Sequence, residues 1–358
     1  MDRIMVAMSG GIDSSVTAAI LNEKGYEVLG ITMRIVPDYV NEAAGQEGGC
    51  CAVEDAKKVA AHLNIKHYTV NFKDIFHDRV IENFAEEYSS GRTPNPCIIC
   101  NKTIKFSALK RRAEELDCDG MATGHYARKK HSKGRDRYLL RRARDENKDQ
   151  SYMLYKLDQQ QLNFSCFPLG DWSKEKVRER AEKINLPVKD KKESQEICFV
   201  PGDNYVDFLE KNFSNTGSPG PIYYVDGQKI GTHQGLHKYT VGQRRGLGIS
   251  LSHPVYVIEI NREDNSIIVG PRKELSCSGL IADNANWIYW ENPPQTFQAE
   301  VQIRYNSTPR KAGVVLLSDN RLRIDFEEKV EAVAPGQSAV LYRKDIVLGG
   351  GRIRRAIR

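Results

Sequence analysis

The stretch best suited to chemistry lies near the N-terminus, where residues 4–15 read IMVAMSGGIDSS. The apolar run of residues 4–8 predicts a short buried strand, and the apolar periodicity after Ser15 predicts a helix. Between them, Gly10 and Gly11 allow a sharp turn and a close backbone approach to a ligand, because neither carries a Cβ. The amides of this turn and of the first helical turn would form an anion nest, and phosphate is the expected ligand.

This glycine turn differs from the two most familiar phosphate-binding loops. The GxxxxGK[ST] spacing of a Walker A loop and its lysine are absent, and so is a GxGxxG pattern. An ordinary strand-to-helix turn without a ligand is the alternative interpretation, and the tripeptide SGG alone would favour it. The flanking strand and helix and the full SGGxDS string favour phosphate binding instead.

The second reactive stretch is Cys97-Ile98-Ile99-Cys100, which follows Thr93-Pro94-Asn95-Pro96. We expect a helix to begin right after Cys100, and its dipole would lower the pKa of that thiol from about 8.5. Lys102 and Lys105 would add positive charge nearby. A metal site or a buried packing cysteine are the alternatives, although a lone CxxC lacks the second ligand pair of a structural zinc site.

The roles of two further features, Cys198 and the basic run of residues 128–144, depend on how the chain folds. Cys198 lies in a polar segment at the end of the α/β region, and it is a packing cysteine unless the fold brings it near Cys100. Residues 128–144 hold nine Lys and Arg with one acid, and the apolar residues at the centre of this run predict a hairpin. Contact with a phosphate backbone and a solvated surface are both compatible with that excess.

The elements that would position these residues alternate between strand and helix. Strands are predicted over 26–35, 66–72 and 120–123, and helices over 53–64, 75–88, 102–116 and 173–185. Such alternation indicates an α/β domain with a parallel sheet covered on both faces. Ligands bind beyond the carboxyl ends of such strands, where the glycine turn and Gly124-His125 would both lie.

The amino-acid composition and the hydrophobic pattern of the chain change after residue 202. Gly and Pro become frequent, short alternating runs suggest hairpins, and successive short strands near the C-terminus indicate a small β-barrel. We therefore predict three domains: a nucleotide-binding catalytic domain at 1–202, a small central β-rich domain at 203–278 and a C-terminal β-barrel at 279–358.

The length, composition and net charge of the chain are typical of a soluble protein. The chain has 358 residues, of which 28% are charged and 40% hydrophobic, with a net charge of +6. No apolar run is long enough to span a membrane and the first strand begins at once, so we expect no membrane association, no signal peptide and a cytoplasmic location. Eight cysteines in such a chain favour metal or redox chemistry over structural disulfides. The mild positive charge allows a nucleic-acid partner.

Taken together, these motifs resemble the tRNA-specific 2-thiouridylase family, PP-loop ATP pyrophosphatases that place sulfur on C2 of the wobble uridine. The resemblance covers essentially the whole chain, in the segments SGGIDSS, GRTPNPCIICNKTIKF, ATGHYAR, KDQSYML, ESQEICFVPG, YTVGQRRGLG, QIRYNS and APGQSAVLY. It implies a PP-loop domain that binds ATP, a small central domain, and a barrel that helps to bind the anticodon stem-loop of tRNA.

The resemblance also implies roles for individual residues. The expected ATP contacts are Ala7, Met8, Ser9, Gly10, Gly11, Ile12, Asp13, Ser14, Met33 and Gly124. Cys198 would carry a persulfide and Cys100 would be the nucleophile that releases its sulfur. The expected contacts to the target base are Asn95, Pro96 and Cys97. The expected tRNA contacts are His125, Asp149, Gln150, Ser151, Arg304, Tyr305 and Gln337.

The implied cofactors and partners are ATP with Mg²⁺, which Asp13 would assist, tRNA, and a persulfide-donating carrier protein or cysteine desulfurase. Many family members carry Asp where this chain has Cys97, and that Asp is regarded as an acid or base, so the proton-transfer group is open here. An alternative is that Cys97, Cys100 and Cys198 hold an iron–sulfur cluster with one open iron.

Two rival functions explain only part of the sequence. Another PP-loop adenylating ligase or amidotransferase would use SGGIDSS but leave the paired thiols without a role. A non-catalytic RNA-binding module with zinc-bound cysteines would use the basic segments but leave SGGIDSS without a role.

Overall fold

The computed structural model describes residues 3–43, 50–191, 197–200, 202, 204–214 and 217–358. Its internal contacts divide the chain into two compact units. The first comprises Met1–Val80, Cys97–Asp203 and Asp345–Val347, and the second Ile81–Pro96, Asn204–Lys344 and Leu348–Arg358. Within the described residues, no helix combines the length and the apolar character needed to cross a bilayer.

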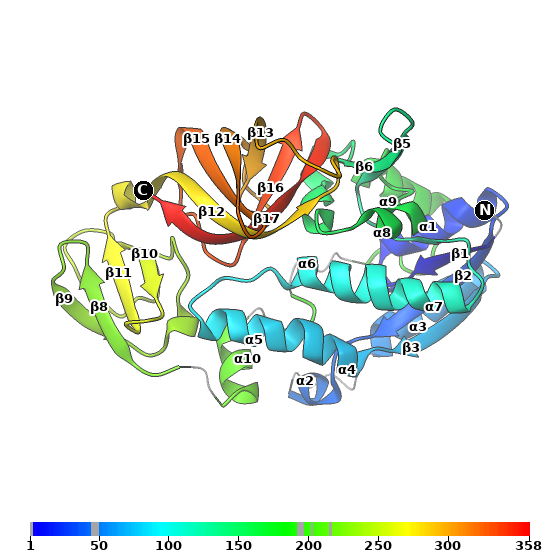
Figure 1. Cartoon of the computed structure of the whole chain (residues 1–358). Helices are drawn as coiled ribbons and strands as arrows, with labels where there is room; N and C mark the ends of the chain where they lie inside the picture. Colours follow the sequence, from blue (N-terminus) through cyan, green and yellow to red (C-terminus); the bar gives the residue numbers. More distant parts are fainter. Residues whose placement is uncertain (1–2, 44–49, 192–196, 201, 203, 215–216) are drawn as a thin grey trace. The chain divides into compact units, whose positions relative to one another are not determined.

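A parallel sheet forms the centre of the first unit (Figure 1). Its strands are β1 (Arg3–Ala7), β2 (Glu27–Arg34), β3 (Lys66–Asn71), β4 (Gly120–Ala122) and β7 (Ser165–Cys166). They lie in the order β3-β2-β1-β4-β7, and every pairing is parallel. The predicted α/β class is confirmed. Because β4 is next to β1, the turns that follow these two strands meet at one edge of the sheet.

Three helices share one apolar core with this sheet: α1 (Ile12–Glu23), α3 (Cys50–His62) and α9 (Lys174–Lys183). Val6 of β1 packs in the same cluster as Val16, Val59 and Val177 from these helices. Full burial of each such side chain contributes about 1.5–3 kcal/mol. Helices α1 and α9 contact each other directly. Figure 1 shows both helices in the same part of the molecule.

The CxxC motif lies in a continuous helical stretch made of α6 (Pro96–Cys100), the π-helical η2 (Asn101–Ala108) and α7 (Leu109–Glu115). The predicted start at residue 102 is therefore wrong. Proline suits the first position of a helix, where its missing N–H leaves no hydrogen bond unmade. A π-helix bonds residue i to i+5, so residue 105 lies one turn beyond Cys100.

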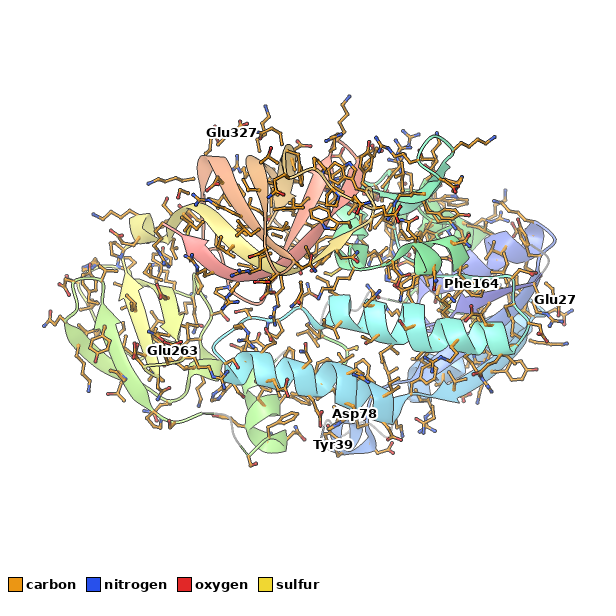
Figure 2. All side chains as sticks on the ribbon, in the orientation of Figure 1. Glu27, Tyr39, Asp78, Phe164, Glu263 and Glu327 are labelled. Carbon is orange, nitrogen blue, oxygen red and sulfur yellow. The ribbon has the colours of Figure 1, made fainter. Side chains whose placement is uncertain are left out.

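Helix α8 (Gln159–Phe164) is fastened to this helical stretch at both of its ends. Before its first turn, Asp158 accepts a hydrogen bond from Lys102 Nζ at 2.8 Å. At its last residue, the ring of Phe164, labelled in Figure 2, lies under Lys110 Nζ at 5.0 Å from the ring centroid. These two contacts tie the helical stretch that carries the cysteines to α8.

Shorter elements complete the first unit, and one of those given next, α5, belongs to the second unit. They are α2 (Asp38–Ala43), α4 (Lys73–Phe76), the π-helical η1 (His77–Ile81), α5 (Glu82–Ser89), β5 (Arg128–Ser132), β6 (Arg137–Arg141), η3 (Glu146–Lys148) and η4 (Ser151–Leu154). Strands β5 and β6 pair as an antiparallel hairpin, which confirms the hairpin predicted for the basic run.

The second unit contains a small sheet and a barrel. After α10 (Tyr205–Asn212), the sheet orders β10 (Tyr256–Asn261), β11 (Ser266–Gly270), β8 (Gly220–Tyr224) and β9 (Lys229–His233). The barrel strands are β12 (Ser276–Trp287), β13 (Thr296–Gln302), β14 (Arg310–Leu317), β15 (Arg321–Glu331), β16 (Ser338–Arg343) and β17 (Ile346–Ile357). Their order is β12-β15-β14-β13-β16-β17, and β12 pairs back with β17, which confirms the predicted barrel.

Candidate active site

The glycine turn after β1 has the conformation expected of an anion nest. Gly10 has φ of +69°, and a Cβ on it would lie 2.3 Å from the carbonyl oxygen of Ala52 in α3. Only glycine fits there without moving backbone. Gly11 is the N-cap of α1 and no described side chain caps this helix, so the amides of the first turn keep their capacity to bind an anion.

Two hydroxyls stiffen the turn from within. Ser14 Oγ accepts a hydrogen bond from the amide of Ser9 at 3.1 Å and donates one to the carbonyl of Gly11 at 3.1 Å. Ser9 Oγ lies 3.3 Å from the same hydroxyl and is exposed. Of the two serines, Ser9 is therefore the one placed to meet a ligand, while Ser14 shapes the turn.

The other residues predicted to bind ATP surround this turn. A Cβ on Gly124, which follows β4, would lie 2.9 Å from the amide nitrogen of Ser14, so the two turns touch. Met33 is half-buried on β2, the other neighbour of β1. Met8 and Ile12 are 2% and 4% exposed and belong to the core. Their side chains would pack beneath a bound nucleotide, and only their backbone would meet it.

Asp13 has two partners that the sequence analysis did not identify. Its Oδ1 accepts a hydrogen bond from the Tyr126 hydroxyl at 2.8 Å and one from Lys174 Nζ at 2.7 Å. Tyr126 belongs to the GHYA segment after β4, and Lys174 is the first residue of α9. One feature of the sequence could have pointed to Lys174: it is a lysine at the first position of a helix, where the dipole disfavours a cation.

The predicted tRNA contact at 149–151 is built into the same network. The amide of Tyr126 donates to Gln150 Oε1 at 3.0 Å, and the amide of Gln150 donates to the Tyr126 carbonyl at 2.8 Å. The carboxylate of Asp149 is 7% exposed and accepts from the Ser151 hydroxyl, from the amide of Ala143 and from the Arg142 guanidinium. Asp149 therefore shapes this turn, and contact with RNA would come from its neighbours.

The three cysteines predicted to do the chemistry all lie in the first unit and are free thiols. Cys97 and Cys198 reach solvent, whereas Cys100 is 8% exposed. Burial, and then charge on the thiols of Cys100 and Cys97, raises the pKa of the Cys198 thiol. Cys198 is therefore coupled electrostatically to both cysteines of the CxxC motif.

Burial dominates the acidity of these thiols. It raises the pKa of Cys100 to about 11 and that of Cys198 to about 12, and it also raises the pKa of Cys97. Cys198 reaches solvent, but protein surrounds it on enough sides for burial to remain the largest cause. The expected lowering of the Cys100 pKa is therefore wrong, because loss of solvation outweighs the helix dipole.

Of the two lysines expected beside the thiols, only one acts on them. Lys102 Nζ is bound to Asp158 and to Gln161 of α8 at 2.8 and 3.0 Å. Lys105 lowers the pKa of Cys97, Cys100 and Cys198, each against the larger effect of burial. The π-helical turn explains this difference, because it puts residue 105 rather than 104 one turn beyond Cys100, while Ile104 is fully buried.

His125 connects the helical stretch of the CxxC motif with the nucleotide turn. It directly follows Gly124, its ring lies 5.8 Å from the ring of Phe106 in η2, and its Nδ1 is 2.8 Å from the Thr123 hydroxyl. Burial, with a smaller effect of Lys105, holds the pKa of His125 well below 6.5. A neutral imidazole suits contact with a base or ribose better than with a phosphate.

In the second unit, the barrel holds the arm that leads to the CxxC motif. Gln337 Nε2 donates to the carbonyls of Thr93 and Pro94 at 2.9 and 3.3 Å, and the amide of Thr93 donates to the Pro335 carbonyl at 2.8 Å. Gln337 thereby fixes the backbone just before Asn95-Pro96, the residues expected at the target base.

Two further expected tRNA contacts lie in the barrel itself. Arg304 is exposed; its amide donates to the Ser307 hydroxyl at 3.1 Å, and its guanidinium donates one long hydrogen bond, at 3.4 Å, to the Glu331 carbonyl. Tyr305 is half-buried and its carbonyl accepts from Gln302 Nε2 at 2.6 Å. The Arg304 side chain is therefore accessible to a charged ligand such as a phosphate.

The basic run is partly neutralised inside the first unit. Asp345 Oδ2 lies 2.8 Å from Arg128 Nη2 and 2.7 Å from Arg141 Nη2, and Arg142 Nη1 is 3.1 Å from Asp149. These three arginines support the hairpin. Contact with a phosphate backbone would fall to the other basic residues of 128–144.

Comparison with known proteins gives matches along nearly the whole chain. Residues 2–202 match the family described as "tRNA methyl transferase HUP domain", residues 206–271 the "tRNA methyl transferase PRC-barrel domain", and residues 277–353 the "Aminomethyltransferase beta-barrel domain". These ranges correspond to the parallel-sheet domain, the small sheet and the barrel.

Full-length relatives identify the family. The chain is 50% identical over 357 residues to "tRNA-specific 2-thiouridylase MnmA" of Halothermothrix orenii, with 99% of each chain covered. It is 48% identical over 360 residues to the protein of that name from Natranaerobius thermophilus, with 99% of this chain and 98% of the relative covered. The resemblance found in the motifs is thereby confirmed, and the chain belongs to the tRNA-specific 2-thiouridylase family.

Proposed function

We propose that this chain converts the wobble uridine of tRNA into 2-thiouridine, with ATP to activate the base and a cysteine persulfide to supply sulfur. The observation that supports the proposal is a chain of contacts, within one unit, that leads from the glycine turn to the helical stretch of the thiols. The glycine turn touches Gly124, His125 packs on η2, and the thiols of Cys100 and Cys198 lie within electrostatic reach of each other. Sulfur transfer needs both sites at one base.

ATP makes the C2 oxygen of the uridine a leaving group. That oxygen attacks the α-phosphate, pyrophosphate departs, and the base becomes adenylated. The amides of the glycine turn would stabilise the negative charge that develops on pyrophosphate. An anticodon loop is already single-stranded, so extrusion of its base costs little. Asn95 and Pro96 would border the base, since Gln337 fixes the backbone before them.

Sulfur transfer then uses the two thiols in turn. The terminal sulfur of a Cys198 persulfide attacks C2, and AMP leaves. The Cys100 thiolate attacks Sγ of Cys198, which breaks the sulfur–sulfur bond, leaves sulfur on C2 and joins the two cysteines in a disulfide. An external thiol reductant restores both. Because the pKa of Cys100 is about 11, this thiol must lose its proton during the reaction, and Lys105 is the cation that favours the loss.

Two inorganic groups fit the residues present. A Mg²⁺ ion would be held by Asp13, whose carboxylate borders the anion nest with its side chain 31% exposed, and would supply charge neutralisation at pyrophosphate. An iron–sulfur cluster would be held by Cys97, Cys100 and Cys198, three free thiols of the first unit that influence one another electrostatically, and would supply an iron at which sulfide binds. The donor sets suit both, and iron analysis of anaerobically purified protein distinguishes the cluster from the persulfide.

The partners follow from the reaction. tRNA is the substrate, and its anticodon stem-loop would meet His125, Gln150 and Arg304. The sulfur on Cys198 would come from a persulfide-donating carrier protein or a cysteine desulfurase, which reaches Cys198 because that thiol is exposed.

The test is thiolation of tRNA by the wild type and by single cysteine variants, read out by mass analysis of digested tRNA. Cys198→Ser and Cys100→Ser should form no 2-thiouridine while still binding tRNA and exchanging ATP with pyrophosphate. Cys118→Ser is the matched control, since Cys118 is a buried cysteine of the same unit and should leave the yield unchanged. Thiolated tRNA from either of the first two variants would end the proposed role of that cysteine.

A further inference from the structure

Lys174 occupies a place that is unfavourable for a lysine in two ways. It is the first residue of α9, after the N-cap Ser173, and the positive end of a helix dipole disfavours a cation there. Its side chain is also 7% exposed, and lysine is seldom buried without a partner. A lysine that is both buried and placed at the positive end of a helix dipole needs a compensating interaction. Lys174 finds that interaction at the glycine turn.

The compensating partner is Asp13 of the SGGIDSS motif. Lys174 Nζ donates to Asp13 Oδ1 at 2.7 Å, across 161 positions of sequence. The Tyr126 hydroxyl donates to the same oxygen at 2.8 Å, and the ammonium lies 5.8 Å from the centroid of the Tyr126 ring. Two donors on one oxygen fix the orientation of the carboxylate.

The second oxygen of Asp13 is left for another ligand. Among the described residues, no group donates a hydrogen bond to Oδ2. The carboxylate is 31% exposed and stands in the first turn of α1, beside the amides that would bind phosphate. An anionic oxygen in that place would repel a phosphate unless a cation lies between them.

We propose that Lys174 is a positioning residue for nucleotide activation: it holds Asp13 so that its second oxygen binds the Mg²⁺ ion of ATP. The sequence lacks the lysine of a Walker A loop, and here a lysine from a distant helix serves the loop indirectly, through a carboxylate. The inference rests on the proposed function only in taking Mg²⁺ and ATP as the ligands.

The test measures binding of radiolabelled ATP by equilibrium dialysis over a range of Mg²⁺ concentrations, without tRNA. In Lys174→Met, the Mg²⁺ concentration that gives half-maximal ATP binding should rise about tenfold, because a charge-assisted contact is lost. ATP binding in excess EDTA should not change. Lys176→Met is the matched control, since Lys176 is exposed on the same helix, and it should behave as the wild type.

A double-mutant cycle with Asp13→Asn separates positioning from other roles. If Lys174 acts through Asp13, Lys174→Met should shift the Mg²⁺ dependence less than twofold once Asp13→Asn is present. Full and independent effects of the two substitutions would overturn the inference, as would a wild-type Mg²⁺ dependence in Lys174→Met. If Lys174→Met does not fold, Lys174→Gln, which keeps a donor but not the charge, should show the shift in its place.

Failure of the inference is distinguishable from failure of the proposed function. If the wild type binds Mg²⁺ and ATP and the Lys174 variants bind them equally well, the positioning role is refuted and sulfur transfer is unaffected. If the wild type binds no ATP at any Mg²⁺ concentration, the activation step itself is refuted, and the positioning role falls with it.

Discussion

The thiol of Cys100 shows how this site balances reactivity against protection. Burial raises its pKa to about 11, so at neutral pH it is a protonated thiol and a poor nucleophile. The same burial shields it from oxidants, which attack exposed thiolates first. Among the residues that the structure describes, Lys105 is the cation that opposes burial at all three thiols, so its removal has a direct chemical signature.

We expect Lys105→Met to raise the pKa of the Cys100 and Cys198 thiols further. The raised pKa means that the thiolate fraction grows as pH rises, so alkylation by iodoacetamide should accelerate above pH 9 in the wild type. At pH 9 the variant should react about tenfold more slowly, since a nearby opposite charge shifts a pKa by about one unit and the thiolate fraction falls tenfold with each unit. Mass spectrometry of the two cysteine peptides measures the rates.

Lys102→Met is the control for this experiment. Lys102 is bound to Asp158 and Gln161, so its loss removes the same charge from the same helical stretch without touching the thiols. An equal slowing in both variants would show that Lys105 has no special relation to the cysteines.

At the scale of elements, the glycine turn before α1 depends on its close contact with the backbone of α3. Gly10→Ala would place a methyl group 2.3 Å from the Ala52 carbonyl and keep a residue with a side chain at φ of +69°. Left-handed backbone alone costs about 1–2 kcal/mol. We expect ATP binding in equilibrium dialysis to fall at least tenfold, with a lower melting temperature.

The neighbouring glycine supplies a matched comparison. A Cβ on Gly11 would be 3.5 Å from Ser9 Oγ, an ordinary contact, and its φ of −100° suits any residue. Gly11→Ala should therefore retain ATP binding within about threefold, apart from a small capping cost. Equal losses in the two variants would mean that the turn fails for a reason other than the Ala52 contact.

The elements were predictable from sequence to the extent that local patterns determine them. Apolar runs and alternation of strand and helix predicted the parallel sheet, and short alternating runs predicted the barrel. The helix over 96–115 was predicted to start too late, because the π-helical turn after Cys100 follows no simple periodicity. The Asp13–Lys174 pair was not predictable, since the contact depends on how α1 and α9 pack and not on either segment alone.

At the scale of the whole molecule, the chain crosses between its two units more than once. Residues 345–347 belong to the first unit although most of their sequence neighbours belong to the second. Asp345 is the counter-charge for both Arg128 and Arg141 of the basic hairpin. The division into domains at 1–202, 203–278 and 279–358 remains a prediction. It assigns one continuous range to each domain and so does not include the return of residues 345–347 to the first unit.

We expect Asp345→Ala to destabilise the first unit by about 1–2 kcal/mol, because Arg141 loses its carboxylate partner and Arg128 keeps only the 3.9 Å pair with Asp171. The shift in the urea unfolding midpoint measures the effect. Asp319→Ala removes a carboxylate that is 79% exposed and pairs only with Arg321 in a barrel turn, so its effect should be below about 0.5 kcal/mol. Similar shifts for both variants would contradict the role given to Asp345.

The position of Asp345 near the end of the chain also bears on how the protein is made. During translation, the hairpin of residues 128–141 leaves the ribosome long before its acidic partner is synthesised. Arg128 and Arg141 are therefore synthesised well before their shared carboxylate, which follows Arg128 by 217 positions. A fragment that ends at residue 202 would keep the complete parallel sheet yet never receive that carboxylate, and should be recovered in lower soluble yield than the full-length chain.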